Sequence, residues 1–195
     1  MLATEFRDAL HDAFHLANLS RADKTGMVGY GVIHLYEGDP VEGTKLLIPF
    51  GNLITDAGDL YVAGKIITAI SPAVPAAPTA ANGMKLGTGV TAVTKAGVAA
   101  ALVTYLTASN VVFDASFPAT VNLGAGLGVN AQYKTTWAAG VATNAAITEV
   151  AIVNDQATNL TTTAANTYSR AVFTAVNKGA SDSLAITYNW KALGA

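Results

Sequence analysis

The sequence contains no cysteine, which excludes disulfide bonds, zinc–thiolate sites and thiol catalysis. Charged residues make up only 12% of the 195 residues, about half the share in an ordinary soluble domain. The 11 Lys and Arg are outnumbered by 13 Asp and Glu, so no positive surplus is left to bind a phosphate backbone. The longest wholly apolar stretches, such as Val98–Val103, are far shorter than the ~20 residues that cross a bilayer. We therefore expect neither a nucleic-acid nor a membrane partner.

The first part of the chain holds a large share of the few charges. Residues 4–19 predict an amphipathic helix with Phe6, Leu10 and Phe14 on one apolar face. Such a face needs a covering surface, and we expect these three residues to form the interface of an attachment arm; the alternative is that the helix packs on its own domain. We assign residues 1–45 to this arm, although Val28–Tyr36 also predicts a strand.

The middle of the chain, residues 46–82, is predicted to hold a strand, a helix and a linker. Lys45–Phe50 reads as a short strand, and a helix begins at Asp56. Ser71-Pro72 should end that helix, because a residue before proline disfavours helical geometry. The Pro- and Ala-rich run Ser71–Asn82 predicts an extended linker.

Residues 83–195 predict a separate β domain. Val129–Trp137 and Ser183–Lys191 alternate apolar and polar side chains, and Ile147–Asn154 and Tyr168–Ala175 supply further strands. Ala96–Leu106 fits a buried helix or a buried strand, and we favour a helical turn followed by a strand. The predicted fold class is mainly β: an antiparallel, jelly-roll-like β-sandwich with an N-terminal helical arm and one additional helix.

Few residues suggest catalysis or metal binding. His11 and His15 have the i, i+4 spacing of a metal pair, but the HDAFH segment lacks the glutamate of a zinc peptidase. We interpret both as solvent-exposed, and His34 as a hydrogen-bonded structural residue. Asp56 and Asp59 fit helix capping better than paired acid–base catalysis. We predict no enzyme activity, catalytic residue, metal or cofactor.

Three other groups have a possible binding function and a simpler structural interpretation. Glycine clusters could cradle a phosphate, a short Asn/Asp/Gln run could contact a cation, and four aromatic residues could stack on a sugar. We favour strand turns for the first, a turn for the second and core packing for the third. The segments are, in that order, Gly87–Gly89 with Gly124–Gly128, Asn154–Gln156, and Tyr133, Trp137, Tyr188 and Trp190.

Several segments together resemble a family of bacteriophage virion proteins. They are MKLGTG at Met84–Gly89, ITEVAIVN at Ile147–Asn154 and SRAVFTAVNKGASDSLAITYNW at Ser169–Trp190, preceded by NLITDAGDLYVAGKI at Asn52–Ile66. Their order and spacing cover about half of the chain. Family members generally carry Gly-Leu-Phe after the Ile-Thr-Glu element, whereas this chain has Ala-Ile-Val at Ala151–Val153.

The resemblance implies a β-sandwich module on a phage particle. We expect a capsid decoration or cement protein on the outer capsid surface of the virion, made in the host cytoplasm, that bridges and stabilises major capsid protein subunits. Low net charge favours self-association, and we expect a homo-oligomer, with a homotrimer favoured because several arms would combine weak contacts. The alternatives are a tail, neck or fibre component, or a carbohydrate-binding adhesin.

Overall fold

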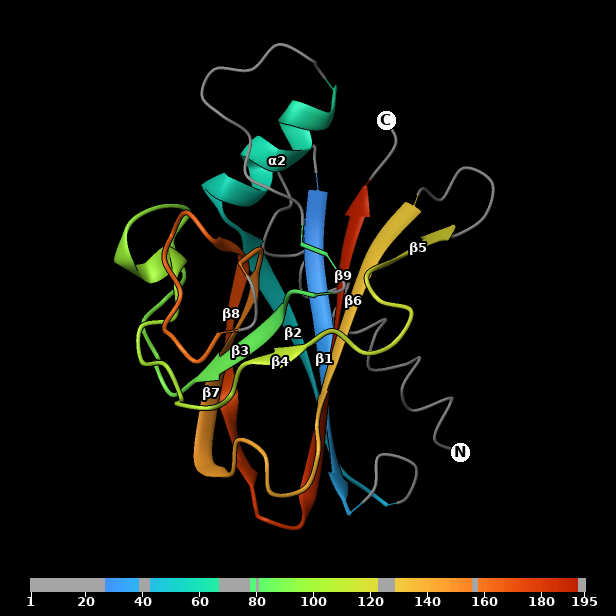
Figure 1. Cartoon of the computed structure of the whole chain (residues 1–195), viewed down its shortest axis with the longest axis vertical. Coiled ribbons are helices and arrows are strands. Elements are labelled where there is room, and N and C mark those ends of the chain that lie inside the picture. Colours follow the sequence, from blue (N-terminus) through green and yellow to red (C-terminus); the bar gives the residue numbers. More distant parts are fainter. Residues whose placement is uncertain are drawn as a thin grey trace.

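The computed structural model describes residues 27–38, 43–66, 78–79, 81–122, 129–155 and 158–192. Over these residues the chain is mainly β, with nine strands and one α-helix, α2 (Asp56–Ile66) (Figure 1). The strands are β1 (Met27–Glu37), β2 (Thr44–Ile54), β3 (Gly83–Gly87), β4 (Val111–Val112), β5 (Ala119–Asn122), β6 (Val129–Trp137), β7 (Asn144–Val153), β8 (Thr167–Lys178) and β9 (Asp182–Ala192).

All nine strands belong to one antiparallel sheet that curls into a half-barrel. The order across the sheet is β4-β3-β7-β8-β2-β1-β9-β6-β5. Curling brings the two ends of the sheet together: the Asp114 N–H, just after β4, donates to the Lys134 carbonyl on β6 at 2.9 Å. In Figure 1, β3 and β4 accordingly cross in front of β1 and β2. The concave side of the sheet therefore encloses one shared core.

The core is built from alternate residues of the strands, as the period of two requires. On β6, Tyr133 and Trp137 face inward, and on β9 Ile186 and Tyr188 do so. The opposite half of the sheet contributes Ile152 and its neighbours on β7 and β3. Aromatic rings pack together in the core: Phe50 lies 5.9 Å from Phe173 on the neighbouring strand, Phe113 lies 5.4 Å from Tyr133, and Tyr168 stacks on Trp190 at 6.0 Å. The inward faces predicted for β6 and β9 are confirmed except at Val129, the first residue of β6, which is 43% exposed.

The predicted boundary at residue 45, between the attachment arm and the middle of the chain, falls inside the sheet. β1 pairs with β9 along its whole length, from Met27 opposite Ala192 to Glu37 opposite Asp182, and pairs with β2 on its other edge. Residues 27–37 are thus a central strand, so a cut at residue 45 would separate hydrogen-bonded neighbours. The predicted helix at residues 4–19 lies outside the described residues.

Other element predictions meet mixed outcomes. Val129–Trp137 matches β6 at both ends, and β1, β2, β7, β8 and β9 lie where strands were predicted. Of the turn and strand favoured in Ala96–Leu106, the structure has a 3-10 helix at Val98–Ala100, but the strand was wrong, because only an isolated bridge joins Tyr105 to Gly87. The short edge strands β4 and β5 were not predicted.

The start of α2 corrects the assignment of its cap. The Gly58 N–H donates to the Thr55 hydroxyl at 3.3 Å, so Thr55, and not an aspartate, caps the helix. Asp56 and Asp59 lie in the first turn, where their negative charge favours the helix dipole. α2 rests on the end of β8, with the Tyr61 ring 5.4 Å from that of Tyr168.

Candidate functional site

The predicted interface residues Phe6, Leu10 and Phe14 lie outside the described residues, as do His11 and His15. Gly124–Gly128 and Gln156 also lie outside them. Among the described residues, the sheet and its loops carry the candidate site.

The four aromatic residues considered for sugar stacking are core residues. Tyr133, Trp137, Tyr188 and Trp190 are almost completely buried. Burial raises the pKa of the Tyr133 and Tyr188 hydroxyls, so both rings stay neutral. The Trp137 indole N–H donates to the Ser109 carbonyl at 2.7 Å, an internal contact that fixes the ring. These residues offer no surface to a glycan.

A layer of loops covers the convex face of β3, β7 and β8. We call residues 88–106 and 158–166 the loop shell. Leu102 packs on Ala151 and Val153 of β7, which makes a second, smaller apolar cluster on this side of the sheet. The Leu102 N–H donates to the Thr162 hydroxyl at 2.9 Å, which joins the two segments. Both faces of β7 are therefore buried.

Beneath the loop shell lies a buried ion pair. Glu149 on β7 and Arg170 on β8 have side chains with 0% exposure, and the Arg170 Nη2 to Glu149 Oε2 distance is 2.6 Å. Arg170 Nε also donates to Oε2 at 2.7 Å. A buried pair is tolerated only when its remaining hydrogen-bonding capacity is satisfied.

Backbone groups of the loop shell satisfy that capacity. The N–H groups of Gly89 and Thr104 donate to Glu149 Oε1 at 2.9 and 2.8 Å, and that of Val103 to Oε2 at 3.1 Å. Arg170 in turn donates to the carbonyls of Ala99 at 2.9 Å and Thr91 at 3.1 Å. The Gly87–Gly89 cluster thus contributes to an anion cradle, and the anion is a carboxylate of the chain itself.

The space beneath the loop shell accommodates only a glycine at position 87. A Cβ at position 87 would lie 2.4 Å from both the Glu149 Oε1 and the Thr104 carbonyl oxygen, far inside contact distance. The turn predicted for Gly87–Gly89 is therefore a close approach of backbone to carboxylate, which a side chain would block.

A second buried cation anchors the other segment of the loop shell. Lys85 on β3 has a fully buried side chain, and its Nζ donates to the Leu160 carbonyl at 3.0 Å. The Asp155 carboxylate lies 3.6 Å from the same Nζ. Asp155 belongs to the Asn154–Gln156 run, so its charge is directed to a lysine of the sheet. This supports the turn interpretation over cation binding.

The outer surface of the loop shell is almost uncharged and carries exposed apolar side chains among threonines. Val98, Val90 and Leu160 are 82%, 74% and 68% exposed. Lys95 is the one charged residue in residues 88–106 and 158–166, and its ammonium contacts the Asp59 carboxylate. Exposed apolar side chains on a backbone pinned from below form a surface that is already ordered before a partner arrives.

Sequence reasoning missed Glu149, Arg170 and Lys85 as a set. The signal was present: each is a charged residue inside a run of strand residues that is otherwise uncharged. A charge inside a buried strand must find a partner, which period-two patterns alone do not identify. His34 was interpreted correctly: its ring lies 2.7 Å from the Thr44 hydroxyl, and burial lowers its pKa to about 4.

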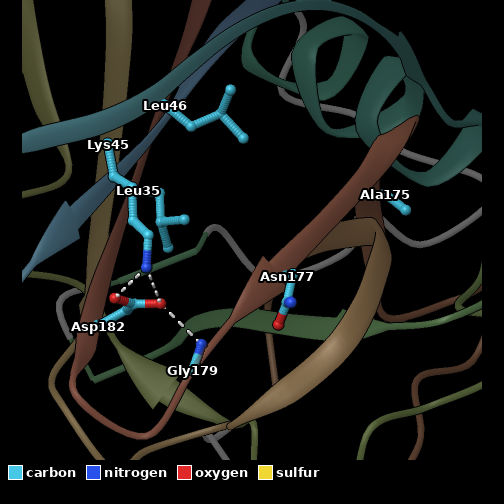
Figure 2. A pocket seen from close by; sticks show the side chains of 7 residues that line it. All are labelled: Leu35, Lys45, Leu46, Ala175, Asn177, Gly179 and Asp182. Atoms are coloured by element: carbon cyan, nitrogen blue, oxygen red, sulfur yellow. Dashed lines mark hydrogen bonds and ion pairs between the residues drawn. The ribbon is translucent and has the colours of Figure 1, made fainter.

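A second feature is a hollow of about 390 Å³ between β2 and β8 (Figure 2). At its polar end the Lys45 Nζ lies 2.9 Å from the Asp182 Oδ1. The Lys45 hydrogen bond holds the pKa of the Asp182 carboxyl below its ordinary value, against the opposing effect of desolvation. Desolvation lowers the pKa of the nearby Lys178, whose Nζ donates to the Ala138 carbonyl at 3.0 Å.

No known protein family, curated relative or solved structure matches the chain. Among the described residues, no group of three or more His, Asp and Glu is placed to hold a metal ion. The part of the chain that the structure describes has no helix with the length and apolar character needed to cross a bilayer.

Proposed function

We propose that this chain is a structural virion protein of the capsid decoration or cement type, which bridges neighbouring subunits of a major capsid protein. The observation that carries the proposal is the loop shell: a nearly uncharged surface with exposed Val90, Val98 and Leu160, held in place by the buried Glu149–Arg170 pair. Large apolar side chains that stay exposed on an ordered, uncharged backbone favour a contact surface for another protein. The segment resemblance and the 12% charge content point the same way.

The proposed architecture is a jelly-roll-like β-sandwich with a helical arm. Its two layers would be β4-β3-β7-β8 and β2-β1-β9-β6-β5, which face each other across one core and connect through only two residue pairs of β2 and β8. The arm would be residues 4–19, with Phe6, Leu10 and Phe14 toward the partner. A truncation that tests the arm should end at residue 26, because residues 27–37 form β1.

The mechanism is burial of surface across subunit boundaries. Covering three Val or Leu side chains contributes about 1.5–3 kcal/mol each, whereas association costs about 4–15 kcal/mol. One loop shell therefore binds weakly. A homotrimer would present three loop shells and three arms at high effective concentration, which turns weak contacts into stable attachment. A capsid whose subunits are bridged in this way opens only when these contacts also break.

The test compares two matched variants on phage capsids that lack this protein. Val98→Asp places a charge at an 82% exposed position of the loop shell, and Val121→Asp makes the same change on β5, where the side chain is 37% exposed; thermal unfolding checks that both variants fold. We expect cryo-electron microscopy to show full occupancy for the wild-type protein and for V121D, and strongly reduced occupancy for V98D. Equal occupancy of the two variants would remove the loop shell from the proposal.

The same images separate the alternatives. If density for the protein lies on the tail, neck or fibre and none lies on the capsid, the protein is a tail component and not a decoration protein. The adhesin alternative loses the aromatic residues on which it rested, since these are buried. Specific glycan-array binding by the purified protein would restore it.

A further inference from the structure

β2 and β8 are neighbours in the sheet but are hydrogen-bonded at one end only. Their register contains two residue pairs, Leu53 opposite Arg170 and Ile54 opposite Ser169. Continued along the strands, this register sets Phe50 opposite Phe173, and these rings are in contact at 5.9 Å. Beyond this aromatic pair β8 has a register shift between Val172 and Val176, and no ladder joins it to β2 there in the described residues.

The strands diverge around the hollow of about 390 Å³. Figure 2 shows Lys45 and Leu46 from β2 on one side, Ala175 and Asn177 from β8 on the other, and an open space between the two ribbons. The residues that line it are Leu35, Lys45, Leu46, Ala175, Asn177, Gly179 and Asp182. We call this space the β2–β8 seam.

Both strands that border the seam are paired on their far edges. β2 pairs with β1 as far as Thr44, and β8 pairs with β7 at Val176 and Lys178, with register shifts between these pairs and Val172. The near edges, residues 44–48 and 173–178, face each other across the seam, and Pro49, which has no N–H, limits the row of donors on β2 to the residues before it. A strand edge without a neighbour presents N–H and C=O groups in a row, which is the template that an added strand recognises.

We propose that the β2–β8 seam is an acceptor site for an extended peptide segment of an assembly partner, which enters as an added β-strand. The backbone edges select an extended chain without proline. Leu35, Leu46 and Ala175 give the seam apolar walls, and its one cation, Lys45, is already neutralised by Asp182. The segment that fits carries uncharged, small or β-branched side chains over about four residues, each with a rise of ~3.3 Å.

This inference is independent of the loop shell. The loop shell lies on the convex face of β3, β7 and β8, whereas the seam opens between β2 and β8. A partner held by both would contact the protein through side chains at one place and through its backbone at the other.

The test uses a synthetic peptide in which Thr and Val alternate, with a Lys at each end for solubility. A matched peptide carries N-methyl groups at alternate residues, which removes the N–H donors of one edge while keeping the side chains. We expect saturable binding of the first peptide, with NMR shift changes confined to the backbone amides of residues 44–48 and 173–179. The methylated peptide should bind at least about tenfold more weakly, the loss expected when backbone hydrogen bonds are removed.

Two protein variants complete the experiment. Ala175→Trp fills the seam from an exposed position of β8 and should weaken binding at least about tenfold. Ala92→Trp adds the same side chain at an exposed position of the loop shell and should leave binding unchanged. Thermal unfolding confirms that both variants fold. Absence of saturable binding at roughly millimolar peptide, or equal binding of the two peptides, would overturn the proposal whatever the variants do.

Discussion

Glu149→Gln is the substitution that most directly tests how the loop shell is held. The carboxylate accepts from Arg170 and from three backbone N–H groups of the loop shell, and both side chains of the pair are fully buried. An amide of nearly the same shape keeps one oxygen but turns an NH₂ toward groups that are themselves donors. It also leaves the Arg170 guanidinium charged and unpaired in the interior.

The expected loss of stability follows from that unpaired charge. Removing one partner of a buried ion pair costs about 3–5 kcal/mol. For a domain of this size each kcal/mol lowers Tm by roughly 2–4 °C, so the variant should melt about 6–20 °C below the wild type. The residues freed from their acceptor, Gly89, Val103 and Thr104, should also exchange their amide protons faster.

The assay is urea unfolding with hydrogen exchange on the same samples. Asp59→Asn serves as the control, because it makes the same chemical change in an exposed ion pair with Lys95 and should cost at most about 1 kcal/mol. A loss below about 1 kcal/mol for Glu149→Gln, with unchanged exchange in the loop shell, would refute the anchoring role of the carboxylate.

Three further outcomes are expected. The His34 imidazole should titrate with a midpoint near pH 4, because burial disfavours its charged form. The unfolded chain takes up the same proton near pH 6.5, so this residue makes the free energy of unfolding fall as the pH drops from 6.5 toward 4. An NMR titration midpoint near 6.5 would contradict the structure. Asp182→Asn should remove part of the acid sensitivity of the protein below pH 3.8. The lowered pKa of Asp182 gives stability that is present above pH 3.8 and is lost as the pH falls through the pKa of the folded state. Identical curves of Tm against pH for the variant and the wild type would count against the Lys45 contact. Trp137→Phe should cost about 1–3 kcal/mol in urea unfolding, because the buried Ser109 carbonyl loses its donor; an unchanged midpoint would show that water or another donor replaces the indole.

The parts of the fold that were predictable are those encoded locally. β6 and β9 alternate apolar and polar residues over a full strand, and a period of two can be recognised without knowing the neighbours. The start of α2 was equally visible, although its cap, Thr55, lies one residue before the predicted aspartate. Edge strands such as β5, with four residues, are too short to show a period.

The candidate sites depend on contacts that no local pattern encodes. Glu149 and Arg170 are 21 residues apart, and the register of β7 with β8, which sets Ala151 opposite Arg170, decides that they meet. The charges in their strands could be noticed, but their partner could not be named. The β2–β8 seam depends on where two strands stop pairing, which is a property of the curled sheet and not of composition.

The position of β9 between β1 and β6 has a consequence for biosynthesis. The ribosome makes β1 and β6 well before residues 182–192, so both strands emerge without their common neighbour. The nascent chain must keep these edges from pairing with other chains until translation reaches β9, since unpaired edges are prone to aggregation. Closure of the sheet is therefore a late event, and the long sequence separation between β1 and β9 should make it slow.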